Sequence, residues 1–221
     1  MIVNLLDDIP HGATGQMTPF DHQAIYDKAA DGYGRSHDRW LRHAGGEAQC
    51  AFEGAVTALL QPGMRVIDVA CGTGTVARRL RKGAGGAFNL TLLDASAAML
   101  DHCSDITATR VVGCMKNLPF PDNTFDLLTC AWGIETVDDP AKALAEFMRV
   151  SRPGGHICIV HCADRPAHSL LGRALRHRIT TSGRGRFLNH DLLSRQAAMI
   201  GAKRIQTLHC TGPAAAMLLH V

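Results

Sequence analysis

From residue 64 onward, short apolar runs alternate with stretches of helical spacing, and this order is the strongest constraint on the fold. A strand–helix–strand order makes neighbouring strands parallel, with helices packed on both faces of the sheet. The expected strands are 64–70, 88–94, 110–113, 125–131 and 156–161. The expected helices between them are 75–81, 96–103 and 140–149. We therefore predict an α/β fold with a doubly wound, mostly parallel sheet.

The length and composition of the chain fit one domain. Its 221 residues are 46% hydrophobic, which is enough for a sizeable core. Residues 1–20 are polar and contain Pro10, Gly12 and Gly15, so we expect a flexible arm before a domain over 21–221. No apolar run is long enough to cross a bilayer, and the first residues do not resemble a signal peptide, so we expect a cytoplasmic location. The formal charge of +3 does not indicate a nucleic-acid partner.

The cysteines and histidines show no pattern of a disulfide framework or a metal site. Eight cysteines are scattered without a C-x-x-C pair, and we expect them to be reduced. Neighbouring strand residues such as His161 and Cys162 face opposite sides and do not easily share a metal ion. The sequence therefore predicts no metal.

A buried strand, a glycine loop and a helix follow one another between residues 65 and 81. The strand carries Asp68 near its end, and Cys71-Gly72-Thr73-Gly74 forms the turn before the helix. Small residues allow a ligand to approach the backbone closely, and the helix N-terminus offers free N–H groups. Residues 72–77 also satisfy the loose G-x-G-x-x-G/A pattern of NAD-binding proteins. Asp68 argues against NAD, because a carboxylate repels phosphates and attracts an ammonium group.

Five segments together resemble class I S-adenosylmethionine-dependent methyltransferases, and in particular the ubiquinone/menaquinone biosynthesis group. They are 66–80, 92–100, 117–126, 149–156 and 211–220, and the likeness covers about 21–221. The resemblance implies a Rossmann-like, seven-stranded sheet with an antiparallel last strand and S-adenosyl-L-methionine as cofactor. It also implies a helical lid over 21–60, and it leaves the acceptor and the accepting atom open.

The resemblance assigns the cofactor site to the carboxyl ends of the strands. Asp68 would hold the ammonium group of the methionine moiety, and Asp94 would accept hydrogen bonds from the ribose hydroxyls. The full set of cofactor-binding candidates is Tyr33, Asp68, Ala70, Cys71, Gly72, Gly74, Asp94, Ala95, Met99, Cys114, Met115, Ala131 and Trp132. Met99 and Trp132 have the plain core as an alternative role, and Tyr33 a surface turn.

Two positions depart from the family pattern. Ala70 replaces a glycine, and its methyl group fits if the residue keeps a negative φ. Cys114 stands where relatives often have an aspartate for the adenine amino group, and a thiol is a poor acceptor. The altered adenine site supports a second hypothesis, a non-catalytic member of the fold that only binds the cofactor. A small NAD-linked oxidoreductase is the third.

The expected reaction is direct displacement at the methyl group, and a base is needed only if the acceptor must lose a proton. His161, at the end of the fifth predicted strand, is the candidate base, with His37 and His190 as other possibilities. A hydrogen-bonded strand-end histidine is the alternative role for His161.

The segment 163–190 is predicted to be a basic insert on the substrate side. From Arg165 to Arg195 there are seven arginines and one aspartate. Residues 168–179 can form a basic amphipathic helix, which would lie on an anionic membrane or guide an amphiphilic, anionic substrate. A solvated face is the alternative. The typical motifs of nucleic-acid methyltransferases are not present in the sequence, so no nucleic-acid partner is expected.

Overall fold

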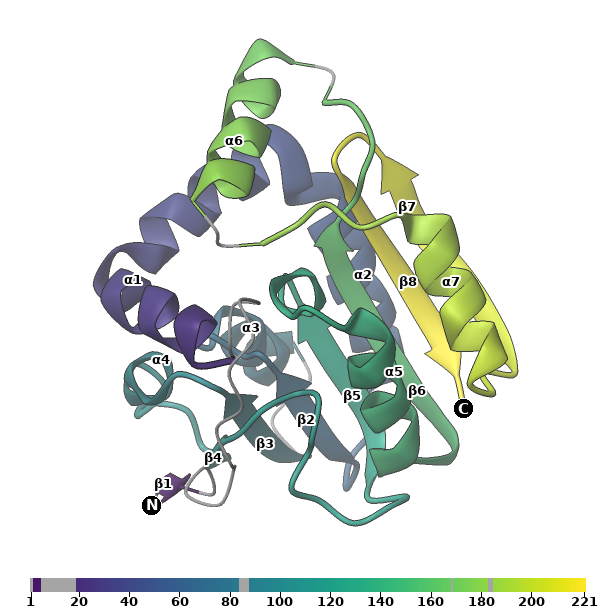
Figure 1. Ribbon diagram of the computed structural model, residues 1–221. Helices are drawn as coiled ribbons and strands as arrows, with labels where there is room; N and C mark the ends of the chain where they lie inside the picture. Colours follow the sequence, from purple (N-terminus) through teal and green to yellow (C-terminus); the bar gives the residue numbers. More distant parts are fainter. Residues whose placement is uncertain (1, 5–18, 84–87, 168, 183–184) are drawn as a thin grey trace.

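A single mixed sheet forms the centre of the computed structural model, which describes residues 2–4, 19–83, 88–167, 169–182 and 185–221 (Figure 1). The strands are β1 Ile2–Asn4, β2 Arg65–Val69, β3 Asn89–Asp94, β4 Thr109–Val112, β5 Phe125–Ala131, β6 Ser151–Cys162, β7 Arg204–Thr211 and β8 Ala214–His220. Their order is β1-β4-β3-β2-β5-β6-β8-β7. Only β8 is antiparallel to its neighbours, β6 and β7. The predicted seven-stranded, Rossmann-like sheet with an antiparallel last strand is confirmed in β2–β8.

The helices cover both faces of the sheet, as the alternation of strands and helices predicts. They are α1 Pro19–Trp40, the π-helical segment η1 Leu41–Gly45, α2 Gly46–Leu59, α3 Thr75–Gly83, α4 Ala97–Asp101, the 3-10 turn η2 Ile134–Thr136, α5 Pro140–Val150, α6 Leu170–Thr181 and α7 His190–Met199. One apolar core joins α2 and α3 to the sheet, and a second joins α5 and α7 to the opposite face. The helix α5 illustrates the local signals, because Asp139 caps it and Pro140 occupies its first turn.

The N-terminal region differs from the arm that we expected. Residues 2–4 form β1, which pairs in parallel with β4 and adds an eighth strand at the sheet edge. Helix α1 begins at Pro19, and residues 5–18 lie outside the described part of the chain. Ser96 at the start of α4 is hydrogen-bonded to Asp27 of α1, so α1 lies against the end of β3.

Helix α1 of the expected lid and helix α6 of the expected insert lie beyond the carboxyl ends of β5 and β6 (Figure 1), whereas α2 packs on the face of the sheet. The lid consists of α1, η1 and α2, and the insert contains α6. Helix α6 contacts η1, so the two segments meet although they are far apart in sequence. None of the helices in the described ranges has the length and apolar character required to span a bilayer.

Candidate functional site

The glycine loop between β2 and α3 requires its glycines. Gly72 and Gly74 have φ angles of 53° and 77°, which side chains rarely adopt. A Cβ atom on Gly74 would lie 2.5 Å from Cδ1 of Ile106. The N–H of Gly72 donates a 2.8 Å hydrogen bond to Oδ2 of Asp94, which ties the loop to the end of β3. The loop is therefore held against the two strands whose ends carry the predicted site.

Ala70 adopts a left-handed backbone conformation and not one with a negative φ. Its φ is 54°, so the condition of a negative φ is not met, and the residue adopts a conformation natural to a glycine. The left-handed region costs a residue with a Cβ atom about 1–2 kcal/mol. A Cβ atom on Gly133 would lie only 2.4 Å from Cβ of Ala70. The loop after β2 and the loop after β5 are therefore in direct contact through this methyl group.

Asp68 has a buried carboxylate with only one of its two oxygens hydrogen-bonded among the described residues. Its side chain is on β2, and Oδ1 accepts a 2.8 Å hydrogen bond from Oγ1 of Thr129. Oδ2 is buried and has no hydrogen-bond partner among the described residues. Burial raises the pKa of Asp68 to about 7, the bond from Thr129 opposes this shift, and the nearby charge of Asp94 adds to it. An unpartnered carboxylate oxygen in such surroundings favours a cationic ligand group.

Asp94 ends β3 and organises the backbone around the glycine loop. Besides the bond from Gly72, its Oδ1 accepts a 2.9 Å hydrogen bond from the N–H of Ser96. Burial raises the pKa of Asp94 to about 6, and the hydrogen bonds from the backbone N–H groups of Ser96 and Gly72 limit that shift. Each carboxylate oxygen can accept a further bond, so Asp94 can still accept from a ligand diol.

Aromatic side chains from the lid and from the loop after β5 lie around one cavity. Tyr33 stacks on His37 with ring centroids 5.6 Å apart, and its Cε1 lies 3.8 Å from the position of a Cβ on Gly72. Trp132 has a φ of 56°, and its Nε1 donates a 2.6 Å hydrogen bond to Oε1 of Gln49. Trp40 meets Trp132 edge-to-face, 5.7 Å between centroids. Tyr33 thus lies near the glycine loop and also lines the cavity.

The other predicted cofactor residues lie along the same edge of the sheet. Met99 is 1% exposed, which fits its alternative role in the core, and its N–H is bonded to Oγ of Ser96. Met115 is buried, with its terminal methyl 3.6 Å from the position of a Cβ on Gly133. Four further positions are Cys71, which is buried, and Ala95, Cys114 and Ala131, which are half-buried. The fold therefore places most of the predicted cofactor-binding residues at the carboxyl edge of the sheet.

His161 lies at the carboxyl end of β6, but its side chain faces away from the cavity. Its ring is fully buried on the face covered by α7, where Nε2 lies 3.2 Å from Nδ1 of His190. Its Nδ1 donates to the carbonyl of Cys162, and Nε2 of His190 lies 3.1 Å from Oγ1 of Thr207. Burial lowers the pKa of His161 to about 4. The next residue, Cys162, lines the cavity, so His161 points away from it, in a hydrogen-bonded position that fits its alternative role.

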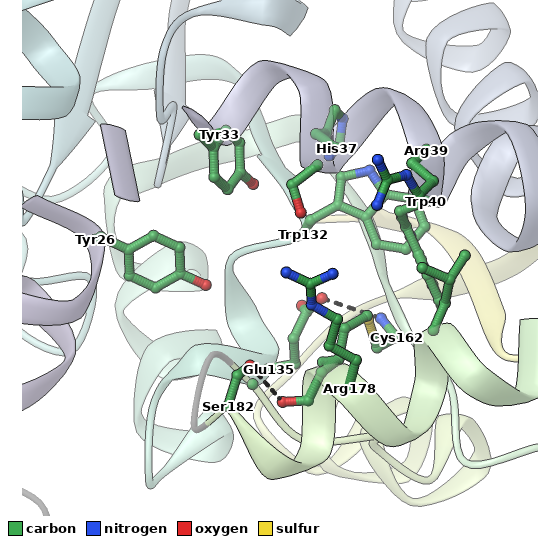
Figure 2. A pocket seen from close by; sticks show the side chains of 14 residues that line it. Tyr26, Tyr33, His37, Arg39, Trp40, Trp132, Glu135, Cys162, Arg178 and Ser182 are labelled. Atoms are coloured by element: carbon green, nitrogen blue, oxygen red, sulfur yellow. Dashed lines mark hydrogen bonds between the residues drawn. The ribbon is translucent and has the colours of Figure 1, made fainter. Parts of the chain in front are cut away.

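The cavity holds an acidic residue that the sequence analysis missed. Glu135, on η2, is 3% exposed and its Oε1 accepts a 3.2 Å hydrogen bond from the N–H of Cys162. Its Oε2 is buried without a hydrogen-bond partner within the described ranges. Figure 2 shows Glu135 together with Tyr26, Trp132 and Arg178 around the open space. An acidic residue three positions after Trp132, directly following the apolar Ile134, was the signal available in the sequence.

The cavity lies between α1, α6 and the ends of β5 and β6. The space between its lining side chains amounts to about 750 Å³, including the part open to solvent. Its lining combines aromatic and apolar side chains with a few charged ones, which is typical of sites that bind small organic ligands. Arg39 of α1 and Arg178 of α6 line it, together with Leu175 and Ile179. No group of three potential metal ligands occurs in the part of the chain that the structure describes.

Comparisons with known proteins agree with this arrangement. Residues 67–159 match the family described as "Methyltransferase domain". The ubiquinone/menaquinone biosynthesis C-methyltransferase of Teredinibacter turnerae is 35% identical over 125 residues, which are 52% of this chain and 49% of that protein. The demethylmenaquinone methyltransferase of Renibacterium salmoninarum is 40% identical over 102 residues, 44% of this chain and 41% of that protein. The matches therefore span about half the length of these curated relatives or less.

The solved structures support the fold. A SAM-dependent methyltransferase of Thermotoga maritima, described as a possible histamine N-methyltransferase, superposes with a TM-score of 0.66 at 22% identity. The superposition covers 89% of this chain and 98% of that one. The likeness in fold therefore extends over most of the chain.

Proposed function

We propose that this chain, whose residues 67–159 match the methyltransferase domain family, is a class I S-adenosylmethionine-dependent methyltransferase that transfers a methyl group to a small-molecule or lipid-like acceptor. The cofactor would lie along the carboxyl edge of β2, β3 and β5, and the acceptor would lie in the cavity under α1 and α6. A small-molecule acceptor is supported by the names of two relatives, a ubiquinone/menaquinone biosynthesis C-methyltransferase and a demethylmenaquinone methyltransferase.

The observation that carries this proposal is the free oxygen of Asp68. A buried carboxylate with an unpartnered oxygen is costly unless a ligand satisfies it. A dinucleotide would bring phosphates to this loop, and the negative charge of Asp68 would repel them. The methionine moiety of S-adenosylmethionine brings an ammonium group instead. Asp68 therefore favours the methyl donor over NAD, the alternative that the glycine pattern left open.

The remaining residues fit the other parts of the cofactor. Asp94 keeps acceptor capacity for the ribose hydroxyls, while its bonds to Gly72 and Ser96 hold it in place. Tyr33 lies over the glycine loop and can cover the bound cofactor. The cofactor supplies a methyl group on a positively charged sulfur, which is a good leaving group. The protein's part is to align the acceptor, exclude water and receive a proton where one is lost.

Titration calorimetry tests the assignment. We expect the chain to bind S-adenosylmethionine and S-adenosylhomocysteine, and to bind NADH at least about 100-fold more weakly. Asp94→Ala should weaken cofactor binding about 10- to 100-fold, because it removes hydrogen bonds to a charged acceptor. Asp101→Ala, at the end of α4 and exposed, is the matched control. A chain that binds NADH but not S-adenosylhomocysteine would contradict the proposal.

A second part of the proposal concerns how an amphiphilic acceptor reaches the cavity. A hollow beside the cavity is lined by Arg35, Asp38, Arg39, Arg42, His43 and Leu171. Leu170 and Leu171 at the start of α6 are 77% and 46% exposed. We call these residues, with Leu170, the basic face. Arginines around exposed leucines are typical of surfaces that lie on anionic membranes. Arg39 also lines the cavity, so the basic face adjoins its entrance.

A further inference from the structure

Glu135 is held in a fixed position with one oxygen left for a ligand. Its carbonyl accepts a 3.1 Å hydrogen bond from the N–H of Arg186, and its Oε1 accepts from Cys162. A Cβ atom on Gly185 would lie 3.3 Å from Cγ of Glu135, so the neighbouring loop packs closely on the side chain. Oε2 remains without a partner in the described residues while the side chain lines the cavity.

The groups around Glu135 leave it able to receive a proton near neutral pH. Burial raises the pKa of Glu135 to about 7, and its hydrogen bonds to Cys162 oppose the shift. The titratable and charged groups that surround it are Tyr26 of α1, Cys130 of β5, Cys162 of β6 and Arg178 of α6. A base works best when its pKa lies near the working pH.

His37, the histidine that lines the cavity, is a weaker base than Glu135. Burial lowers the pKa of His37 to about 4, so at neutral pH its ring is uncharged and holds a proton poorly. His37 is also stacked on Tyr33 and meets Trp132 edge-to-face, 6.3 Å between centroids. Its position makes it part of an aromatic wall.

The shape and charge of the cavity define the acceptor. Tyr26, Tyr33, His37 and Trp132 provide flat walls, which favour a planar ring. Arg39 and Arg178 line the same space and favour an anionic group over a cationic one (Figure 2). A ring with one reacting hydroxyl and one anionic substituent satisfies both the acidic and the basic residues.

We propose that Glu135 is the proton acceptor for an aromatic hydroxy acid, whose anionic group is held by Arg178. This inference rests on the proposed methyl transfer. The acceptor O–H bond breaks and its proton goes to Oε2 of Glu135. The oxygen forms a bond to the methyl carbon, and the electron pair of the broken carbon–sulfur bond remains on the sulfur of the departing thioether.

Three phenols of nearly equal shape test the charge preference. With S-adenosylhomocysteine bound, 4-hydroxyphenylacetate should bind at least about tenfold more tightly than the neutral 2-(4-hydroxyphenyl)ethanol and the cationic tyramine. Arg178→Gln should remove this preference, whereas Arg173→Gln, exposed on the same helix, should keep it. Tightest binding of tyramine, or binding of none of the three, would overturn the assigned class.

Methyl transfer from S-adenosylmethionine to 4-hydroxyphenylacetate tests the base. Glu135→Gln should lower kcat about 100-fold or more, since positioned bases contribute that much, and should leave S-adenosylhomocysteine affinity within about twofold. The kcat of the wild-type chain should rise with pH through about 7, and the variant should lose this rise. The control is Asp191→Asn, a carboxylate-to-amide change on the surface of α7.

The outcomes separate the two proposals. An unchanged kcat in Glu135→Gln, or binding of 4-hydroxyphenylacetate without methyl transfer in the wild type, overturns the role of Glu135. Failure of the wild-type chain to bind S-adenosylhomocysteine overturns the proposed function instead.

Discussion

Left-handed backbone conformations mark the carboxyl ends of two adjacent strands. Ala70 after β2 and Trp132 after β5 both have φ angles near 55°, in a region where bulky residues are rare. Such conformations cost on the order of 1–3 kcal/mol each, persist where the surroundings hold them and occur often at ligand sites. Trp132 is held by its N–H bond to the carbonyl of Val160 and by its ring bond to Gln49. The strained residues lie at the edge where we place the methyl donor.

The contact between Ala70 and Gly133 predicts a coupled effect on stability. Gly133→Ala should lower the free energy of unfolding by about 1–3 kcal/mol, the usual cost of overpacking. In an Ala70→Gly background the same substitution should cost less, because the nearest clashing atom is gone. Urea denaturation of the four proteins measures this coupling. Gly54→Ala, with nothing within 4 Å, should be neutral or stabilising. Equal costs of Gly133→Ala in both backgrounds would refute the contact.

Asp68 predicts opposite effects on cofactor binding and on the stability of the free chain. Its folded pKa of about 7 lies above its unfolded value, so its contribution to stability is present at low pH and is lost as pH rises through about 7. Asp68→Asn should therefore stabilise the free chain at pH 8 by about 1–3 kcal/mol and change little at pH 5. Thermal unfolding at the two pH values measures this.

The same residue predicts a pH-dependent affinity. An ammonium ligand needs the ionised carboxylate, so wild-type affinity for S-adenosylhomocysteine should fall as pH drops below 7, and binding at pH 7 should release a proton. Calorimetry in buffers of different ionisation enthalpy detects that release. A wild-type affinity that does not change between pH 5.5 and 8 would contradict this role of Asp68.

At the scale of elements, the sequence predicts the buried strands well and the edges of the sheet poorly. The strands β2, β3, β4 and β5 are confirmed within one residue of their predicted bounds because they are short, apolar and bounded by turn residues. The edge strand β7 was not predicted, because it is largely exposed and the register shift between Thr207 and His209 interrupts its alternation. Helix α7 was hidden in the arginine-rich stretch, since only His190, Leu193 and Ala197 of it are buried.

Helix α6 carries the prediction for the basic face. Leu170→Ser/Leu171→Ser should weaken binding to vesicles with 30% phosphatidylglycerol at least about fivefold, because it removes exposed apolar side chains. Leu192→Ser/Met199→Ser is the matched control, since these side chains are 55% and 86% exposed on α7. Vesicle co-sedimentation measures both, and wild-type binding should weaken at high salt. Equal binding to neutral phosphatidylcholine vesicles would contradict the proposal.

At the scale of the whole molecule, the rule that ligands of open α/β sheets bind beyond the carboxyl ends of the strands predicts the edge at which the cavity lies. That rule placed the ends of β2, β3 and β5 together from sequence alone. It could not assign faces at the end of β6, where His161 points to α7 and Cys162 to the cavity. Nor could it identify Glu135, because its burial depends on the loop around Gly185, which is 50 residues away in the chain.

The position of the cavity predicts where ligand binding changes the dynamics of the molecule. Helices α1 and α6 form its outer walls, whereas α7 packs on the opposite face of the sheet (Figure 1). Saturating S-adenosylhomocysteine and 4-hydroxyphenylacetate should slow amide hydrogen exchange in α1 and α6 and leave α7 unchanged, because only the cavity walls gain contacts. Mass spectrometry of exchanged peptides reads this out. Protection confined to α7 would place the ligands elsewhere.

The contact between Ala70 and Gly133 also has an evolutionary consequence. A methyl group at position 133 costs more while position 70 also carries one, so the effect of a substitution depends on the order in which it arises. A descendant that acquires a glycine at position 70 should tolerate an alanine at position 133 better, beside Trp132 and the cavity, while Cys130 continues to limit larger residues there. The alanine at position 70 thus restricts, through epistasis, the substitutions at position 133 that could change which acceptors the cavity takes.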